Sequence, residues 1–174
     1  SDKSVSKSLN KYQEIALKEI NTSFKTFDIS LLHGVTSSGK TEIYVKKMEA
    51  VIAQGKQVLY LVPEIALTSQ LVHRLQCYFG NQIAVYHSRY TQNERLEVWN
   101  HVLNNSDSAR VIIGARSSVL LPFSNLGLII VDEEHEQSYK QFDPAPRYHA
   151  RDTAIVLASL FKAKTLLGSA TPSI

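Results

Sequence analysis

The amino-acid sequence predicts a three-layer α/β/α fold, in which helices cover both faces of a mainly parallel β-sheet. Short apolar runs alternate along the chain with longer stretches whose apolar residues recur at helical spacing. The runs are apolar on both sides, as in strands that are buried inside a parallel sheet. This alternation implies right-handed crossovers and an open sheet.

Six runs are expected to form the strands of this sheet. In chain order they are ISLLHG, KQVLYLV, QIAVYH, ARVIIGA, LGLIIVDE and KTLLGSA. Ligands of open α/β sheets bind beyond the carboxyl ends of the strands. The residues that directly follow these runs are therefore the candidates for chemistry.

Five stretches are expected to form helices, and three of these are clearly amphipathic. The predicted ranges are 9–23, 41–54, 63–79, 91–105 and 150–161. The apolar faces of the second, third and fourth helices consist of Tyr44, Met48, Val51 and Ile52; of Leu71, Val72, Leu75, Tyr78 and Phe79; and of Leu96, Trp99, Val102 and Leu103.

The composition is that of a folded globular protein. Apolar residues make up 44% and charged residues 20% of the 174 residues, close to globular averages. The net charge of +3 permits contact with a polyanion but does not demand it. The single cysteine, Cys77, excludes an internal disulfide and a multi-cysteine metal site, and it is expected to be a small core residue.

One domain is expected, over residues 9–174, in a cytoplasmic protein. No apolar run reaches the roughly 20 residues of a membrane span, and the polar start is not a signal peptide. Residues 1–8 have the composition of a disordered arm or a cloning remnant. The chain stops directly after a strand-like run, so we expect it to be a fragment of a longer protein.

The stretch GVTSSGKT fits the phosphate-binding loop pattern, and it lies between an apolar strand and an amphipathic helix, as that pattern requires. Gly34 and Gly39 permit the backbone angles of the loop, and its N–H groups hold nucleotide phosphates. Lys40 would contact the β- and γ-phosphates, and Thr41 would bind Mg²⁺. The residues predicted to surround the phosphates are Gly34, Val35, Thr36, Ser37, Ser38, Gly39, Lys40 and Thr41.

A second motif, which is acidic, completes such a site. Four apolar residues are followed by Asp132, Glu133, Glu134 and His135. Asp132 would hold the Mg²⁺ shell, and Glu133 would polarise the attacking water as general base. The alternatives are an ordinary glycine-rich turn with an exposed lysine at the first motif and a solvated acidic helix start at the second.

The acidic motif, and Ser169-Ala170-Thr171 at the end of the last strand, resemble motifs II and III of superfamily 2 helicases. The series LVPEIALT, ERLEVW, GARS, LGLIIVDEEHEQSYKQ, RYHARD and GSATPS is closely similar to the PriA family of primosomal replication-restart helicases. The resemblance covers residues 9–173. One departure is Ser37, where the family more often has glycine.

The resemblance implies a RecA-like P-loop NTPase domain, the first of two motor lobes. Gln13 would then read the adenine edge, and His135 would couple nucleotide state to motif III through Ser169 and Thr171. The resemblance also implies a second RecA-like lobe and a zinc-binding insertion elsewhere in the parent protein, so zinc is not expected in this chain. Partners would be single-stranded or forked DNA and the proteins of the primosome.

Several residues are candidates for DNA binding. Aromatic and basic residues in the segment after the acidic motif have the mixture that single-strand binding requires, and hydroxyl, amide and guanidinium groups of motifs Ia and Ib would hold the DNA backbone without reading sequence. The candidates are Thr68, Gln70, Arg116, Ser117, Tyr139, Lys140, Phe142, Arg147, Tyr148 and Arg151. Core packing of the aromatic residues and helix capping by Ser and Thr are the alternatives.

The resemblance therefore implies an ATP-dependent 3′-to-5′ DNA helicase lobe that acts in replication restart. The isolated lobe is expected to hydrolyse ATP poorly, because the arginine finger of two-lobe helicases comes from the other lobe. Two competing hypotheses are a small-molecule kinase and a non-catalytic DNA-binding module.

Overall fold

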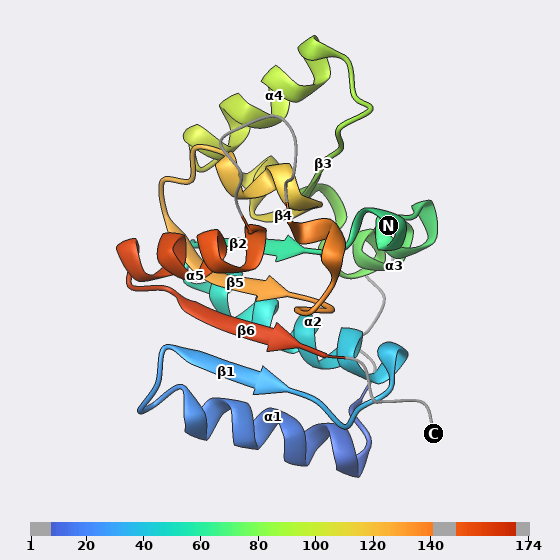
Figure 1. Cartoon of the computed structure of the whole chain (residues 1–174), viewed down its shortest axis with the longest axis vertical. Coiled ribbons are helices and arrows are strands. Elements are labelled where there is room, and N and C mark those ends of the chain that lie inside the picture. Colours follow the sequence, from blue (N-terminus) through green and yellow to red (C-terminus); the bar gives the residue numbers. More distant parts are fainter. Residues whose placement is uncertain (1–7, 141–148, 170–174) are drawn as a thin grey trace.

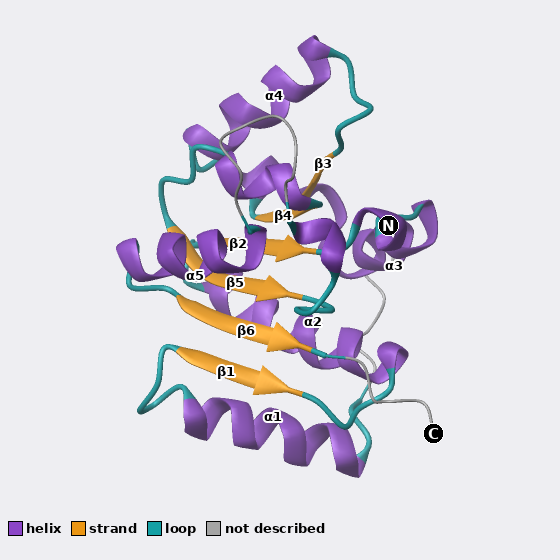
Figure 2. Cartoon of the chain, viewed as in Figure 1, coloured by secondary structure: helices purple, strands orange, loops and turns teal. Residues whose placement is uncertain are grey.

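The structure is a computed structural model of the chain, and it describes residues 8–140 and 149–169. A six-stranded sheet lies between two layers of helices (Figures 1 and 2). All strand pairs of the sheet are parallel. This confirms the predicted three-layer fold.

Each predicted strand is present, and the order of the strands across the sheet is β1-β6-β5-β2-β4-β3. The strands are β1 Ile29–Leu32, β2 Gln57–Leu61, β3 Ile83–Tyr86, β4 Val111–Gly114, β5 Leu126–Val131 and β6 Lys164–Gly168. The central strands β2, β4 and β5 are buried on both faces along nearly their whole length.

Within the described residues five helices are present, and a polar side chain caps the start of each, Asn or Thr in four of them and His149 in the fifth. They are α1 Lys11–Ser23, α2 Ser37–Ala53, α3 Ser69–Phe79, α4 Gln92–Leu103 and α5 Ala150–Leu160. The prediction for α3 began six residues too early. Thr68 accepts a hydrogen bond from the Leu71 N–H and starts the helix there, and Glu64–Ala66 forms a short 3₁₀ turn instead.

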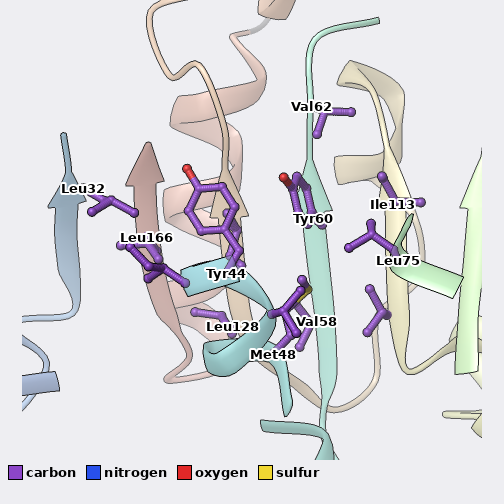
Figure 3. Close-up of a cluster of buried hydrophobic side chains, with 14 of the residues drawn as sticks. Leu32, Tyr44, Met48, Val58, Tyr60, Val62, Leu75, Ile113, Leu128 and Leu166 are labelled. Carbon is purple, nitrogen blue, oxygen red and sulfur yellow. The ribbon is translucent and has the colours of Figure 1, made fainter. Parts of the chain in front are cut away.

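The sheet separates two apolar cores. Helices α1, α2 and α3 cover one face, where residues such as Tyr44, Tyr60 and Leu166 pack (Figure 3). Helices α4 and α5 and the 3₁₀ helix η4, Arg116–Leu120, cover the other face. Helix α5 presents alanines to the sheet, which lets its backbone approach closely.

Three sequence predictions about burial were wrong. On α4 only Val102 is buried, while Leu96, Trp99 and Leu103 are exposed, because the helix packs on the core through Val98 and Val102. Strand β1 is an edge strand, so one of its faces is exposed at alternate residues. Cys77 is exposed, because it lies on the outer side of α3.

The strand register brings the carboxyl ends of neighbouring strands level with one another. Leu32 pairs with Gly168, and Leu167 pairs with Val131. Leu61 then pairs with both Val131 and Gly114. The segments that follow β1, β6 and β5 therefore meet at one half of this edge, and those that follow β2, β4 and β3 meet at the other half. Within the described ranges, none of the helices has the length and apolarity needed to cross a membrane.

Candidate nucleotide site and nucleic-acid interface

The predicted phosphate loop connects β1 to α2. Gly34 has a φ of +78°, a backbone angle that residues with a Cβ rarely adopt. Thr36 caps α2, because its Oγ1 accepts from the Gly39 N–H at 3.4 Å and its carbonyl accepts from the Lys40 N–H at 2.9 Å. The loop therefore turns tightly into the positive end of a helix, which favours an anion.

Gly39 lies where the loop is most crowded. A Cβ at this position would come within 2.9 Å of Val35 Cγ1 and 3.2 Å of Thr36 Oγ1. A side chain at this position would have to displace the Val35 side chain, so glycine permits the close approach of the loop. The side chains of Ser37 and Ser38, two further predicted loop residues, lie outside what the structure describes.

Lys40 joins the phosphate loop to the acidic motif. Its side chain is 1% exposed, and its Nζ lies 3.0 Å from Asp132 Oδ1 and 2.9 Å from Glu133 Oε1. These acids follow β5, and β6 lies between β5 and β1. The three residues predicted to perform catalysis are thus in direct contact although 92 positions separate Lys40 from Asp132.

The charge balance of this cluster keeps Lys40 protonated. Burial lowers the pKa of the Lys40 ammonium, but hydrogen bonds and charges of Glu133 and Asp132 outweigh burial and raise this pKa above its ordinary value. A buried cation held between two carboxylates is a site where a phosphate and a divalent cation can exchange partners. The carboxylates would contact the divalent cation in place of Lys40, and Lys40 would contact the phosphate.

Glu133 has an unusual backbone. Its φ is +50°, in the left-handed region that costs a non-glycine residue about 1–2 kcal/mol. Residues 132–135 form a turn rather than a helix start, and the Glu136 N–H closes it on the Glu133 carbonyl at 2.9 Å. The turn directs the Glu133 carboxylate back to Lys40 instead of into solvent.

Gln13 lies beside the phosphate loop. It completes a capping box at the start of α1, where its Oε1 accepts from the Asn10 N–H at 2.9 Å. Its Nε2 donates to the Gly39 carbonyl at 3.2 Å. One N–H and one lone pair of the amide remain beyond these two bonds, which is the donor–acceptor pair needed to read an adenine edge.

The end of β6 contacts the acidic turn through the main chain. The Glu134 N–H donates to the Gly168 carbonyl at 2.9 Å, and the Ser169 N–H donates to the Leu32 carbonyl at 3.0 Å. The His135 side chain is exposed and makes no hydrogen bond to a described residue. Coupling of His135 to motif III therefore stays a prediction, and Thr171 lies outside the described residues.

The other half of the edge carries the predicted DNA contacts. A cavity of about 120 Å³ opens there, lined by Glu64, Ser88, Ala115, Arg116, Ser117 and Ser138. Arg116 and Ser117, two of the residues predicted to contact DNA, thus line the same cavity. Gln70 is exposed on α3, whereas the hydroxyl of Thr68 is already used as the cap of that helix.

Arg116 makes structural contacts that its sequence position did not reveal. Its Nη1 donates to the main-chain carbonyls of Lys140 at 2.8 Å and Ser138 at 3.3 Å. The guanidinium therefore holds the segment that follows the acidic motif against η4. A contact of Arg116 with DNA would act on that segment as well.

The prediction that Tyr139 stacks on DNA is wrong in this structure. Its side chain is fully buried, and its hydroxyl donates to the carbonyls of Leu61, at 3.2 Å, and of Asp132. Tyr139 fixes the main chain of the acidic motif to the end of β2. The sequence does not show whether this ring is buried or exposed for stacking, because an aromatic residue with basic neighbours in the sequence is compatible with either position.

The remaining predicted DNA residues divide into two groups. Lys140 is half-buried and forms an isolated β-bridge with His149. Arg151 is paired with Glu134, with Nη1 3.0 Å from the Glu134 Oε2, so it faces the acidic motif. Phe142, Arg147 and Tyr148 lie outside the described residues.

Two features near the site do not follow from the sequence analysis. Tyr44 was treated only as a core residue, although it lies four residues after Lys40, a spacing that puts both side chains on one face of a helix. Glu42 joins α2 to α3 by accepting from Arg74 and from the Tyr78 hydroxyl, both at 2.7 Å. No sequence pattern revealed the Glu42 contacts, because the partner helix lies 32 residues further along the chain.

Comparisons with known proteins identify the family. The model of the family described as DEAD/DEAH box helicase matches residues 10–174. The chain belongs to this helicase family. Membership implies that the domain uses a nucleotide, and it disfavours the small-molecule kinase considered above.

Relatives named "Replication restart protein PriA" are similar over most of the chain. The protein from Haemophilus influenzae is 50% identical over 166 residues, which are 95% of this chain and 22% of that protein. The protein from Bacillus subtilis is 49% identical over 146 residues, 84% of this chain and 18% of that protein. The resemblance predicted from the motifs is confirmed, and the chain spans about a fifth of the length of these curated relatives.

Two solved structures share the fold. The structure of RecG bound to a three-way DNA junction superposes with a TM-score of 0.63 at 23% identity, covering 98% of this chain and 22% of that one. A nuclease-deletion mutant of the restriction-modification enzyme LlaGI, in complex with a DNA substrate mimic, gives the same TM-score at 20% identity, covering 97% of this chain and 18% of that one.

Proposed function

We propose that the chain is the ATP-binding motor lobe of a 3′-to-5′ DNA helicase that acts in replication restart, at stalled forks, in the cytoplasm. The observation that carries the proposal is the contact of Lys40 with Asp132 and Glu133. This contact unites the phosphate loop and the acidic motif at one edge of the sheet. The similarity to PriA proteins supports the biological setting.

The residues of the site fit Mg-ATP. Thr41 and Asp132 supply a hydroxyl and a carboxylate, the oxygen ligands that Mg²⁺ prefers when it also holds phosphates. When bound, Mg²⁺ neutralises charge that develops on the phosphates. Lys40 would hold the β- and γ-phosphates, Gln13 would orient the adenine, and Glu133 would accept a proton from the attacking water.

The geometry also supports an incomplete catalytic site. Phosphoryl transfer of this kind requires an arginine finger that contributes about 10³–10⁵ in rate. Of the described arginines, Arg151 pairs with Glu134, and Arg116 holds the main-chain carbonyls of Ser138 and Lys140. A second RecA-like lobe of the parent protein would supply the finger and close the cleft.

DNA would bind along the half of the edge that follows β2, β4 and β3. Arg116, Ser117 and Gln70 would contact its backbone there, without reading sequence. The segment that begins at Lys140 would lie between this DNA and the acidic motif. Primosome proteins are the partners expected from the similarity to PriA.

A segment exchange tests the proposal. The matching 166 residues of the Haemophilus influenzae relative are replaced by this chain, and phosphate release and unwinding of a forked duplex are measured. We expect DNA-stimulated phosphate release and unwinding along a 3′ tail, both abolished by Glu133→Gln. A chimera that binds Mg-nucleotide but releases no phosphate with DNA would support a non-catalytic DNA-binding module instead.

A further inference from the structure

Two buried tyrosines lie directly under the candidate magnesium ligands. Tyr44 is on α2 and Tyr60 is on β2, and both are at most 1% exposed. Their rings meet edge to face, with centroids 5.5 Å apart and an interplanar angle of 89°. Figure 3 shows that both hydroxyls point toward the carboxyl ends of the strands. The pair therefore presents two polar groups to the nucleotide site from inside the core.

Tyr44 contacts the acid. Its hydroxyl donates to Asp132 Oδ1 at 2.8 Å, the same oxygen that accepts from Lys40 Nζ at 3.0 Å. Burial and the charge of Asp132 raise the pKa of Tyr44 well above its ordinary value, so the phenol keeps its proton and remains a donor. Two donors on one oxygen fix the orientation of the Asp132 carboxylate.

Tyr60 contacts Thr41, the second predicted magnesium ligand. It is hydrogen-bonded with the side chain of Thr41, the first-turn residue of α2 that is predicted to bind Mg²⁺. Burial raises the pKa of Tyr60 well above its ordinary value, so the phenol keeps its proton. The hydrogen bond with this buried phenol limits the orientations of the Thr41 hydroxyl.

Gly168 makes room for this arrangement. A Cβ at position 168 would overlap the Tyr44 hydroxyl oxygen and would lie 2.9 Å from Asp132 Oδ1. The last residue of β6 is thus in van der Waals contact with the bond between Tyr44 and Asp132. Residues from α2, β5 and β6 meet at this one hydroxyl group.

We propose that Tyr44 and Tyr60 are positioning residues, which orient Asp132 and Thr41 respectively for magnesium binding. The inference rests on the proposed nucleotide site. Phenylalanine would fill the same two places in the core, but it would leave the carboxylate and the threonine hydroxyl without these partners. Residues that orient metal ligands in this way change metal affinity about 10–100-fold when they are replaced.

The test compares Tyr44→Phe and Tyr60→Phe with the unmodified chain. Binding of a fluorescent ADP analogue is measured over a Mg²⁺ titration and again in EDTA, and folding is checked by circular dichroism. Tyr78→Phe is the matched control, because its hydroxyl also donates to a carboxylate, Glu42 Oε2, at 2.7 Å, rather than to Asp132 or Thr41.

We expect Tyr44→Phe and Tyr60→Phe each to raise the Mg²⁺ concentration for half-maximal binding by about 10-fold or more. Binding in EDTA should change less than twofold, and Tyr78→Phe should leave both values unchanged. An unaltered Mg²⁺ dependence in both variants, or an equal loss with and without Mg²⁺, would overturn the positioning role alone. An unmodified chain that binds no Mg-nucleotide would overturn the proposed nucleotide site itself, and this role with it.

Discussion

Replacing Gly168 with alanine should break the contact between Tyr44 and Asp132 and thereby destabilise the fold. The new Cβ would overlap the Tyr44 hydroxyl oxygen and lie 2.9 Å from Asp132 Oδ1. Overpacking of a core costs about 1–3 kcal/mol, and loss of a hydrogen bond to a charged group costs about 1.5–3 kcal/mol. We expect Gly168→Ala to lower the free energy of unfolding by about 3–5 kcal/mol.

The same substitution should cost less when the hydroxyl is already absent. In a Tyr44→Phe background the hydrogen bond is gone, and the remaining contacts of the Cβ are 2.9 Å to Asp132 Oδ1 and 3.0 Å to the ring carbon Cζ. Small shifts relieve such contacts, so we expect a cost of about 1 kcal/mol. The two substitutions should therefore be coupled by at least about 2 kcal/mol.

Urea unfolding of the four proteins, followed by circular dichroism, measures this coupling. The unmodified chain, both single variants and the double variant form one double-mutant cycle. If Gly168→Ala costs the same free energy in both backgrounds, the Tyr44 hydroxyl does not fill the space beside Gly168, and the described geometry is wrong.

Three further predictions follow from the site and its neighbours. Burial, and next the charge of Arg151, lower the pKa of His149 below 6.5. The unfolded chain therefore binds the proton first, and the free energy of unfolding should fall as pH drops through and below 6.5. His149→Asn, which can still cap α5, should remove this component of the pH dependence measured by urea unfolding. Because Glu133 has a φ of +50°, Glu133→Gly should be more stable than Glu133→Ala by about 1 kcal/mol in thermal unfolding, and equal stabilities would argue against the left-handed turn. Arg116→Ala should weaken binding of labelled single-stranded DNA equally for all sequences and reduce the slope of log affinity against log salt concentration by about 1. Arg116→Lys should keep this slope but lose the hydrogen bonds to the Ser138 and Lys140 carbonyls, which should appear as faster proteolysis near residue 140.

The sequence predicted the fold well because its signals are local. Apolar runs marked the strands, and polar caps such as Asn10, Thr36 and Thr91 stand at the helix starts. The phosphate loop and the acidic motif were also predicted to share an edge, since parallel strands end together. That β6 would lie between them, with Lys40 spanning the distance, is a matter of strand order, which the sequence does not contain.

The errors concern which side of an element faces the core. Tyr139 has the same neighbours in sequence whether its ring stacks on DNA or its hydroxyl anchors the carbonyls of Leu61 and Asp132. On α4, both Val102 and Trp99 suit an apolar face, and only the packing of the helix decides that Trp99 is exposed. The Tyr60–Thr41 and Tyr44–Asp132 contacts likewise depend on tertiary structure, although the spacing of Lys40 and Tyr44 was visible.

The central claim is that this chain holds one half of an ATPase site, and a single titration tests it most directly. A fluorescent ATP analogue with Mg²⁺ is titrated into the unmodified chain, Lys40→Ala and the matched control Lys47→Ala, whose lysine lies on the same helix but bonds to Asn21 at 2.6 Å. Phosphate release is followed with and without single-stranded DNA. We expect saturable binding that Lys40→Ala abolishes and Lys47→Ala preserves, with negligible release. Equal binding by all three proteins, or none at millimolar nucleotide, would contradict the claim, and rapid release by the chain alone would show that the site needs no second lobe.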